Sequence, residues 1–182
     1  MKNFLTLLFL CSTMLSVFAQ DLAWDKAVPF TTQNITKIAR TTAVSILISD
    51  VIDINGFVEV APNVTLKFLK TGRLKIANEG SFLIVKGPID AGIQQIFDVS
   101  AKGVNSYRYE SISNITLFQN KKFYPEWWGI FPNIIPGQDG DTGSRARNHT
   151  LLKELMLDIA ASGGGIIQFS EGVYYIRDIV ID

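Results

Sequence analysis

Short stretches that alternate apolar and polar residues occupy the middle of the chain. Val64–Phe68 alternates in this way, Leu74–Ile76 does the same, and Phe82 with Ile84 follows the same rule. A period of two is typical of a β-strand with one buried face. Each run is three to five residues long, so the pattern predicts several short strands.

Turn-forming residues separate these runs, and a strand recurs every eight to ten residues. This spacing leaves no room for crossover helices and predicts an all-β architecture. An earlier run, Thr41–Ile48, is rich in β-branched residues and predicts a further strand. The separating turns are Pro62-Asn63, Thr71-Gly72, Asn78-Glu79-Gly80, Gly87-Pro88 and Ala91-Gly92.

Two all-β arrangements fit that spacing. One is an antiparallel sandwich or barrel, in which hairpin dipeptides should recur, yet Asn55-Gly56 is the only one of its kind. The other is a β-solenoid, in which the chain turns a corner after each short strand and returns one level higher. The stretch from Val64 to Phe82 has the length of about one such coil. Spacing alone leaves both arrangements open.

A helical pattern interrupts the strands near the C-terminus and predicts one amphipathic helix over 150–161. Asn148 or Thr150 is expected to cap its first turn, and Gly163–Gly165 to end it. The apolar side holds Leu151, Leu152, Leu155, Met156 and Ile159, and the polar side holds Lys153, Glu154 and Asp158.

A strand is expected after these glycines, with Ile167 and Phe169 pointing inward. Gly172 then turns the chain, because a glycine adopts backbone angles that other residues avoid. Val173–Ile176 is expected to begin the next strand.

Residues 1–19 have the features of a secretory signal peptide: one positive charge, a short apolar run, and small residues before the expected cleavage after Ala19. The apolar run is too short for a bilayer core of about 30 Å, although an uncleaved membrane anchor is the alternative. The bulky residues before Cys11 argue against a lipoprotein. We therefore expect a secreted protein, extracellular, at the cell surface or periplasmic, with no membrane span once the signal is removed.

The mature chain contains no cysteine, because the only one is Cys11. A secreted protein without disulfides must depend on a packed core, and roughly 160 residues are enough for one. The formal net charge is zero, so nothing indicates a basic surface for nucleic acid.

Several motifs in the second half of the chain have a familiar order. Tyr124–Gly129 is followed by Asp139-Gly140, by the predicted helix, and by Gly164–Phe169 with Gly172 and Tyr174. This order resembles the opening of the pectate-lyase-like right-handed β-helix family, which includes rhamnogalacturonase-like and phage-tailspike-like proteins. Pro62–Phe68, and Ile89–Gly92 with Gln95–Phe97, also resemble early coils of bacterial members.

The resemblance covers roughly residues 55–182 and departs from the family pattern in places. Asn148-His149-Thr150 stands where Asp-Asp-Thr is usual, the loop after Trp128 is longer than expected, and Ser170-Glu171 replaces the usual Pro-x. These positions chiefly cap, turn and pack, so the implied fold is unaffected. The family's catalytic groups usually lie on later coils, so no catalytic residue is carried over to this chain.

The resemblance implies a right-handed parallel β-helix that is truncated at the C-terminus. Residues 20–125 form an N-terminal strand region with early coils, and 126–182 begin an incomplete pectate-lyase-like domain. The implied function is that of the N-terminal, non-catalytic part of a secreted lyase or glycoside hydrolase, with polysaccharide as partner. The alternatives are a carbohydrate-binding or adhesive β-solenoid without catalysis, and an inactive remnant.

Each residue with suggestive chemistry also has a plain structural interpretation, which we favour. Trp127 and Trp128 suggest sugar stacking, but large aromatic residues more often pack over a core. Asp139–Gly143 lacks the later ligands of a calcium loop and is expected to be a turn. His149, the only histidine, cannot form a common zinc site alone. We expect no metal and no cofactor.

Paired carboxylates could cleave a glycosidic bond, for which they must lie about 5–9.5 Å apart. Asp50 with Asp53, or Asp178 with Asp182, could be such a pair, although sequence alone places neither in a groove. A lyase would instead use a basic residue, and Lys121-Lys122 is expected to be a solvated pair. Four sequons for N-glycosylation begin at Asn34, Asn63, Asn114 and Asn148; the signal has a bacterial character, so we expect them to stay unmodified.

Overall fold

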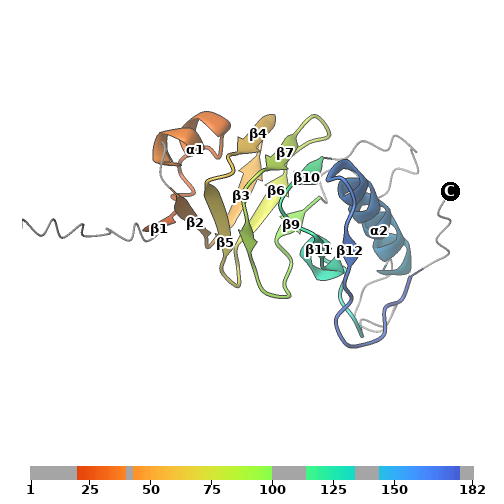
Figure 1. Ribbon diagram of the computed structural model, residues 1–182. Helices are drawn as coiled ribbons and strands as arrows, with labels where there is room; N and C mark the ends of the chain where they lie inside the picture. Colours follow the sequence, from red (N-terminus) through yellow and green to blue (C-terminus); the bar gives the residue numbers. More distant parts are fainter. Residues whose placement is uncertain (1–19, 40–42, 100–113, 134–143, 177–182) are drawn as a thin grey trace, which may run out of the picture.

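The computed structural model describes residues 20–39, 43–99, 114–133 and 144–176, which form mainly short strands in parallel sheets together with two α-helices (Figure 1). The strands are β1 (Gln20–Ala23), β2 (Val44–Ile48), β3 (Val51–Ile54), β4 (Phe57–Val60), β5 (Val64–Phe68), β6 (Arg73–Ile76), β7 (Phe82–Val85), β8 (Ile89–Asp90), β9 (Phe97–Asp98), β10 (Ile115–Leu117), β11 (Lys122–Phe123) and β12 (Ile166–Ile167). The helices are α1 (Thr32–Ala39), the 3-10 turn η2 (Pro125–Trp128) and α2 (Ser144–Ala161).

Most strands belong to three sheets, in which each strand from β2 to β7 pairs with the strand three places later in the chain, while β1 pairs with β2. Sheet A has the order β1-β2-β5-β8, sheet B the order β3-β6-β9, and sheet C the order β4-β7-β10. A separate pair joins β11 to β12. Every pair among the described strands is parallel, which overturns the antiparallel sandwich as an alternative for this part of the chain.

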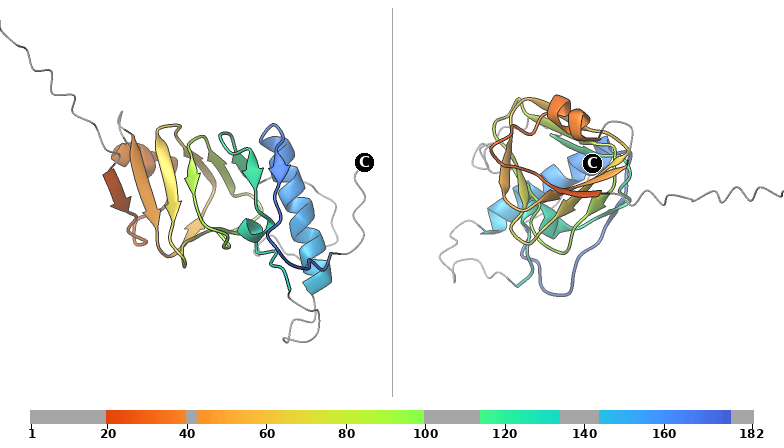
Figure 2. Two further views of the ribbon diagram at one scale, coloured as in Figure 1. Left: turned by 60° about the horizontal axis from the view of Figure 1, so that its bottom comes forward. Right: turned by 90° about the vertical axis from the view of Figure 1, so that its left-hand side faces the viewer.

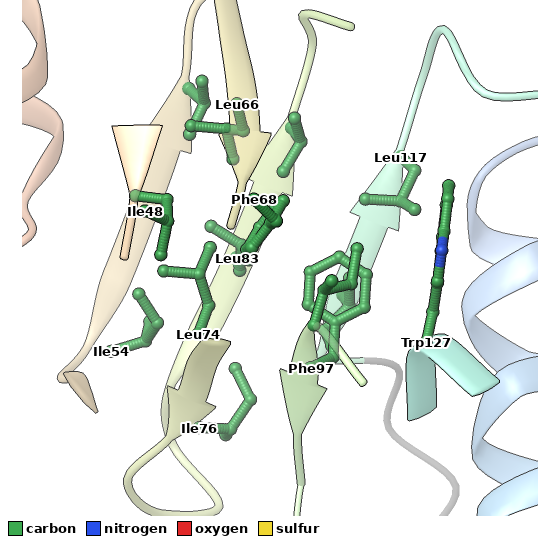
Figure 3. Close-up of a cluster of buried hydrophobic side chains, with 14 of the residues drawn as sticks. Ile48, Ile54, Leu66, Phe68, Leu74, Ile76, Leu83, Phe97, Leu117 and Trp127 are labelled. Carbon is green, nitrogen blue, oxygen red and sulfur yellow. The ribbon is translucent and has the colours of Figure 1, made fainter. Parts of the chain in front are cut away.

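The core lies between the three sheets, because alternate residues of each strand point inward (Figure 3). Strand pairing places apolar residues next to one another on adjacent strands, as with Ile46 and Leu66, and with Leu74 and Phe97. Each fully buried aliphatic or aromatic side chain contributes about 1.5–3 kcal/mol relative to its exposed state. The strand pattern in the sequence therefore accounts for the interior.

Two glycines lie where the backbone passes close to a segment that precedes it in the chain. A Cβ on Gly72 would lie 1.9 Å from the carbonyl oxygen of Ile48, and one on Gly87 would lie 1.9 Å from that of Val64. Only glycine fits at such an approach. These residues therefore set how closely successive bends of the chain can stack.

The two α-helices lie at opposite ends of the array of strands (Figure 2). Helix α1 contacts β4 at one end, and α2 contacts β10 and η2 at the other. The sequence predicted only one helix, so α1 was missed. Its first turn is stabilised by Thr31, whose Oγ1 accepts a hydrogen bond from the N–H of Asn34 at 3.2 Å.

Helix α2 begins at Ser144, six residues before the predicted start at Thr150. Asn148 and Thr150 therefore do not cap it; Asn148 lies within the helix, where its Nδ2 donates to the carbonyl of Tyr175. The error arose because the apolar pattern marks only the part of the helix that packs on the core. Asp158, placed on the polar side by the same pattern, is 1% exposed.

The predicted end of α2 is confirmed. Gly163 and Gly164 both have positive φ, at 82° and 88°. The N–H of Gly164 donates to the carbonyl of Ile159, and that of Gly163 to the carbonyl of Ala160. This pair of bonds is a Schellman motif, which satisfies carbonyls that the last helical turn leaves free.

Three details of the strand predictions were wrong. In β7 the buried residues are Leu83 and Val85, and Phe82 and Ile84 point outward; four consecutive apolar residues carry no alternation, so the neighbouring strands decide the register. Phe169 is 43% exposed instead of buried. The described chain after Gly172, whose φ is 137°, is irregular through residue 176.

Candidate functional site

A row of three charged residues crosses the outward face of sheet B. Strand pairing aligns Asp53 of β3 with Lys75 of β6, and Lys75 with Asp98 of β9. Their strand neighbours Ile52, Leu74 and Phe97 are buried, so alternation turns the three charged side chains outward. Asp53 is exposed, and the other two are half-buried.

The spacing of this row follows from the sheet itself. Adjacent strands lie about 4.8 Å apart, so the backbones that carry Asp53 and Asp98 are separated by roughly 10 Å. Opposite charges on neighbouring strands stabilise a sheet modestly. The arrangement can therefore act as a charge ladder, and it also places two carboxylates on either side of an ammonium group.

The outward face of sheet C is different, because it carries exposed apolar residues. Phe57 of β4 is 59% exposed and Phe118, just after β10, is 51% exposed. Between them Phe82 and Ile84 of β7 are half-buried. We call these four residues the sheet C apolar face.

A single ion pair interrupts the sheet C apolar face. Lys86 Nζ lies 2.8 Å from Glu59 Oε1, and the two side chains are 38% and 33% exposed. Glu59 is paired in register with Ile84. The face therefore combines aromatic rings with one acidic and one basic side chain, both of which are partly exposed to water.

A buried carboxylate lies beneath the segment that follows β12. Glu126 sits in η2 and has no exposed surface. Its Oε1 accepts hydrogen bonds from the hydroxyls of Ser170 and Tyr174, and those two hydroxyl oxygens lie 2.7 Å apart. Its Oε2 is buried and has no hydrogen-bond partner among the described residues.

This cluster ties the segment 168–176 to η2 and to the loop after it. Burial, and then the hydrogen bond to Glu126, raise the pKa of Tyr174 above its ordinary value. Nearby, the N–H of Asn133 donates to the carbonyl of Val173 at 2.8 Å, and Asn133 Oδ1 accepts from the N–H of Val173 at 3.0 Å. Glu126 is buried and Ser170 and Tyr174 are half-buried, and their hydrogen bonds hold this segment against η2.

The tryptophans pack in the interior, as predicted. Trp127 is 4% exposed and Trp128 is fully buried. Their indole N–H groups donate to the carbonyl of Gly92 at 3.0 Å and to Asp158 Oδ2 at 2.9 Å. Trp128 also packs on Phe97, with ring centroids 5.0 Å apart. Neither indole face is free for a sugar.

The other residues with suggestive chemistry are scattered. Asp50 is exposed beside Ser49 and Lys26, and sheet pairing aligns Asp53 with Lys75 instead. Lys121 and Lys122 are exposed, as expected of a solvated pair. His149 lies inside α2 and is half-buried. The predicted turn at 139–143 and the pair Asp178 and Asp182 lie outside the described residues.

Two of the four sequons are inaccessible in the folded chain. Asn114 is 3% exposed, and its Nδ2 donates to the carbonyls of Glu79 and Ser81. Asn148 is 6% exposed. Modification of either side chain would require the structure to open.

The row across sheet B was missed because its members lie far apart in the sequence. Asp53, Lys75 and Asp98 recur after 22 and 23 residues, which is the distance along the chain between paired residues of successive strands in sheet B. A search for charged residues at that period could have found them.

Within the described ranges, the structure contains no group of three or more histidine, cysteine or acidic residues arranged for a metal ion. Among the same residues, no helix has the length and apolar character needed to cross a bilayer. Comparisons with family models, with curated proteins and with solved structures gave no match. The pectate-lyase-like resemblance therefore stays a prediction.

Proposed function

We propose that this chain belongs to a secreted protein that acts on or binds polysaccharide, that its strands wind as a right-handed parallel β-helix, and that its described residues bind without catalysing. The observation that carries the proposal is that each strand from β2 to β7 pairs with the one three places later, in three sheets at once. A chain that circles three sheets and rises one level per circuit produces this pairing.

Two points support such a path: the general preference for right-handed connections between parallel strands, and the close backbone contacts at two glycines. Parallel strands within one sheet are joined by right-handed connections in about 98% of cases, which favours the right-handed form. Gly72 and Gly87, which approach the carbonyls of Ile48 and Val64, stand where one level would pass over the previous one.

Polysaccharide is the favoured partner for two reasons. The motif order from Tyr124 to Tyr174 resembles a family that acts on polysaccharides, and stacked repeats present extended outer faces suited to long ligands. Secretion is inferred from residues 1–19, whose composition is typical of a signal peptide.

The test is to measure binding and turnover with the same purified chain. A panel of neutral and acidic polysaccharides would be examined for co-sedimentation, for release of reducing ends, and for the ultraviolet absorbance of unsaturated lyase products. We expect binding without either product. Turnover would contradict the non-catalytic role, and absence of all binding would contradict the polysaccharide partner.

Hydrolysis at the sheet B row is the second candidate, favoured by one observation. The strand positions of Asp53 and Asp98 are roughly 10 Å apart, just above the range of about 6.5–9.5 Å that separates the carboxyl groups of inverting glycosidases. If the chain releases sugar, Asp53→Asn and Asp98→Asn should each abolish the release. Asp50→Asn, an exposed acid on the adjacent bend, should not.

A further inference from the structure

Resting on the proposed function, we infer that the sheet C apolar face is the binding surface and that it takes a neutral polysaccharide. Phe57, Phe82, Ile84 and Phe118 gather on the outward side of three adjacent strands. Exposure of phenylalanine rings to water is unfavourable, so a set of them on one face marks an interaction surface.

The positions of the two most exposed rings give the surface its length. Phe57 opens β4, and Phe118 lies one position past the pair formed by Leu117 and Val85. They are separated by two strand spacings across the sheet and four residues along it, roughly 16 Å in all. A short run of sugar rings spans this distance, with Phe82 and Ile84 beneath it.

The ion pair in the middle of the face selects among possible occupants. An apolar protein surface would bury Glu59 and Lys86 without supplying hydrogen bonds, which is costly for charged groups. Sugar hydroxyls donate to a carboxylate and accept from an ammonium, while the C–H faces of the rings cover the phenylalanines. The chemistry of the face therefore matches a carbohydrate better than a protein.

The same ion pair indicates the charge of the ligand. Lys86 and Glu59 lie 2.8 Å apart and together contribute no net charge. An acidic polysaccharide needs cations to offset its carboxylates. Lys86 would attract those carboxylates, but Glu59 would repel them about equally. A neutral polysaccharide is therefore favoured over a polyuronate.

The experiment compares the full chain and its variants for co-sedimentation with cellulose, xylan and polygalacturonate. Phe57→Ala and Phe118→Ala should each weaken binding to a neutral polysaccharide by roughly three- to tenfold. Phe57→Leu keeps apolar area but removes the ring, so it should bind as weakly as Phe57→Ala. Val51→Ala alters a residue that is 51% exposed on sheet B and should bind like the unchanged chain. Matching thermal transitions would show that every variant is folded.

Each other outcome overturns the inference in a recognisable way. Equal binding by the phenylalanine variants, or binding to polygalacturonate alone, would remove this site and this ligand class while leaving the proposed function in place. A dimer that Phe57→Ala dissociates would assign the face to a second copy. If no polysaccharide binds, the inference and the proposed function fail together.

Discussion

The carboxylate of Asp158 in α2 accepts a hydrogen bond from the backbone N–H of Ile115 in β10, with Oδ1 and N 3.2 Å apart. Four residues later, Ser162 Oγ accepts from the N–H of Leu117 at 2.8 Å. Residues four apart in a helix rise about 6 Å, close to the roughly 6.6 Å between alternate residues of a strand. Asp158 in α2 and Ser162, the residue that follows α2, thus supply acceptors to the edge of sheet C.

Removing the Asp158 carboxylate should destabilise this end of the molecule strongly. In Asp158→Ala, two buried donors lose their acceptor: the N–H of Ile115 and the indole N–H of Trp128. A buried donor without a partner costs about 1–3 kcal/mol. We expect the free energy of unfolding, measured by urea denaturation, to fall by about 2–5 kcal/mol.

Two comparison variants make this prediction specific. Asp158→Asn offers one acceptor oxygen for two donors, so its effect should be intermediate. Lys153→Ala changes an exposed residue of the same helix and should alter stability by less than about 0.5 kcal/mol. If Asp158→Ala is as mild as Lys153→Ala, the carboxylate does not support the sheet edge.

The opposite edge of sheet C has a similar contact from α1. Thr32 Oγ1 accepts a hydrogen bond from the N–H of Glu59 at 2.8 Å. Thr32→Val keeps the shape but removes the acceptor, so it should cost about 1 kcal/mol and speed hydrogen exchange at the amide of Glu59. Thr32→Ser keeps the acceptor and should exchange at nearly the original rate. Equal exchange in both variants would contradict a role for the hydroxyl.

The sequence was informative where a residue's environment depends on its immediate neighbours. Alternation located β5 with the bounds that the structure has, because Val64–Phe68 alternates cleanly. It failed at Phe82, where a run of apolar residues has no preferred face. The burial of Asp158 was also missed, since a helical pattern places an acid toward solvent unless another element supplies buried donors. The alignment of Asp53 with Asp98 depends on strand register, which local sequence does not contain.

The close approach of the backbone at two glycines should make them intolerant of any side chain. A methyl group on Gly72 or Gly87 would meet a carbonyl oxygen at 1.9 Å, so the backbone would have to move. We expect Gly72→Ala and Gly87→Ala each to lower the free energy of unfolding by more than about 2 kcal/mol. Thermal unfolding followed by circular dichroism would measure the loss.

A third glycine provides the matched control for these substitutions. A Cβ on Gly80 would lie 3.4 Å from Asn78 Oδ1, which is ordinary contact. Gly80→Ala should therefore change stability by less than about 1 kcal/mol. If all three alanine variants unfold alike, close stacking is not the reason for glycine at 72 and 87.

Alkaline pH should release the segment 168–176 from η2. Burial, and then the hydrogen bond to Glu126, raise the pKa of Tyr174 above its ordinary value of about 10. The folded chain therefore holds this proton more tightly than the unfolded chain. Its contribution to stability is complete below pH of about 10 and is lost as pH rises through the folded-state pKa. Hydrogen exchange of residues 168–176, after correction for the intrinsic rate at each pH, should increase in that range.

Tyr174→Phe separates this effect from general alkaline unfolding. The variant lacks the hydroxyl that donates to Glu126 Oε1, although Ser170 still donates to the same atom. It should be less stable by about 1 kcal/mol at neutral pH, and its segment should show no added release above pH of about 10. The difference in tyrosinate absorbance between the two proteins reports the titration of Tyr174 directly. A difference centred at or below the ordinary pKa would show that burial beside Glu126 does not hold the phenol proton.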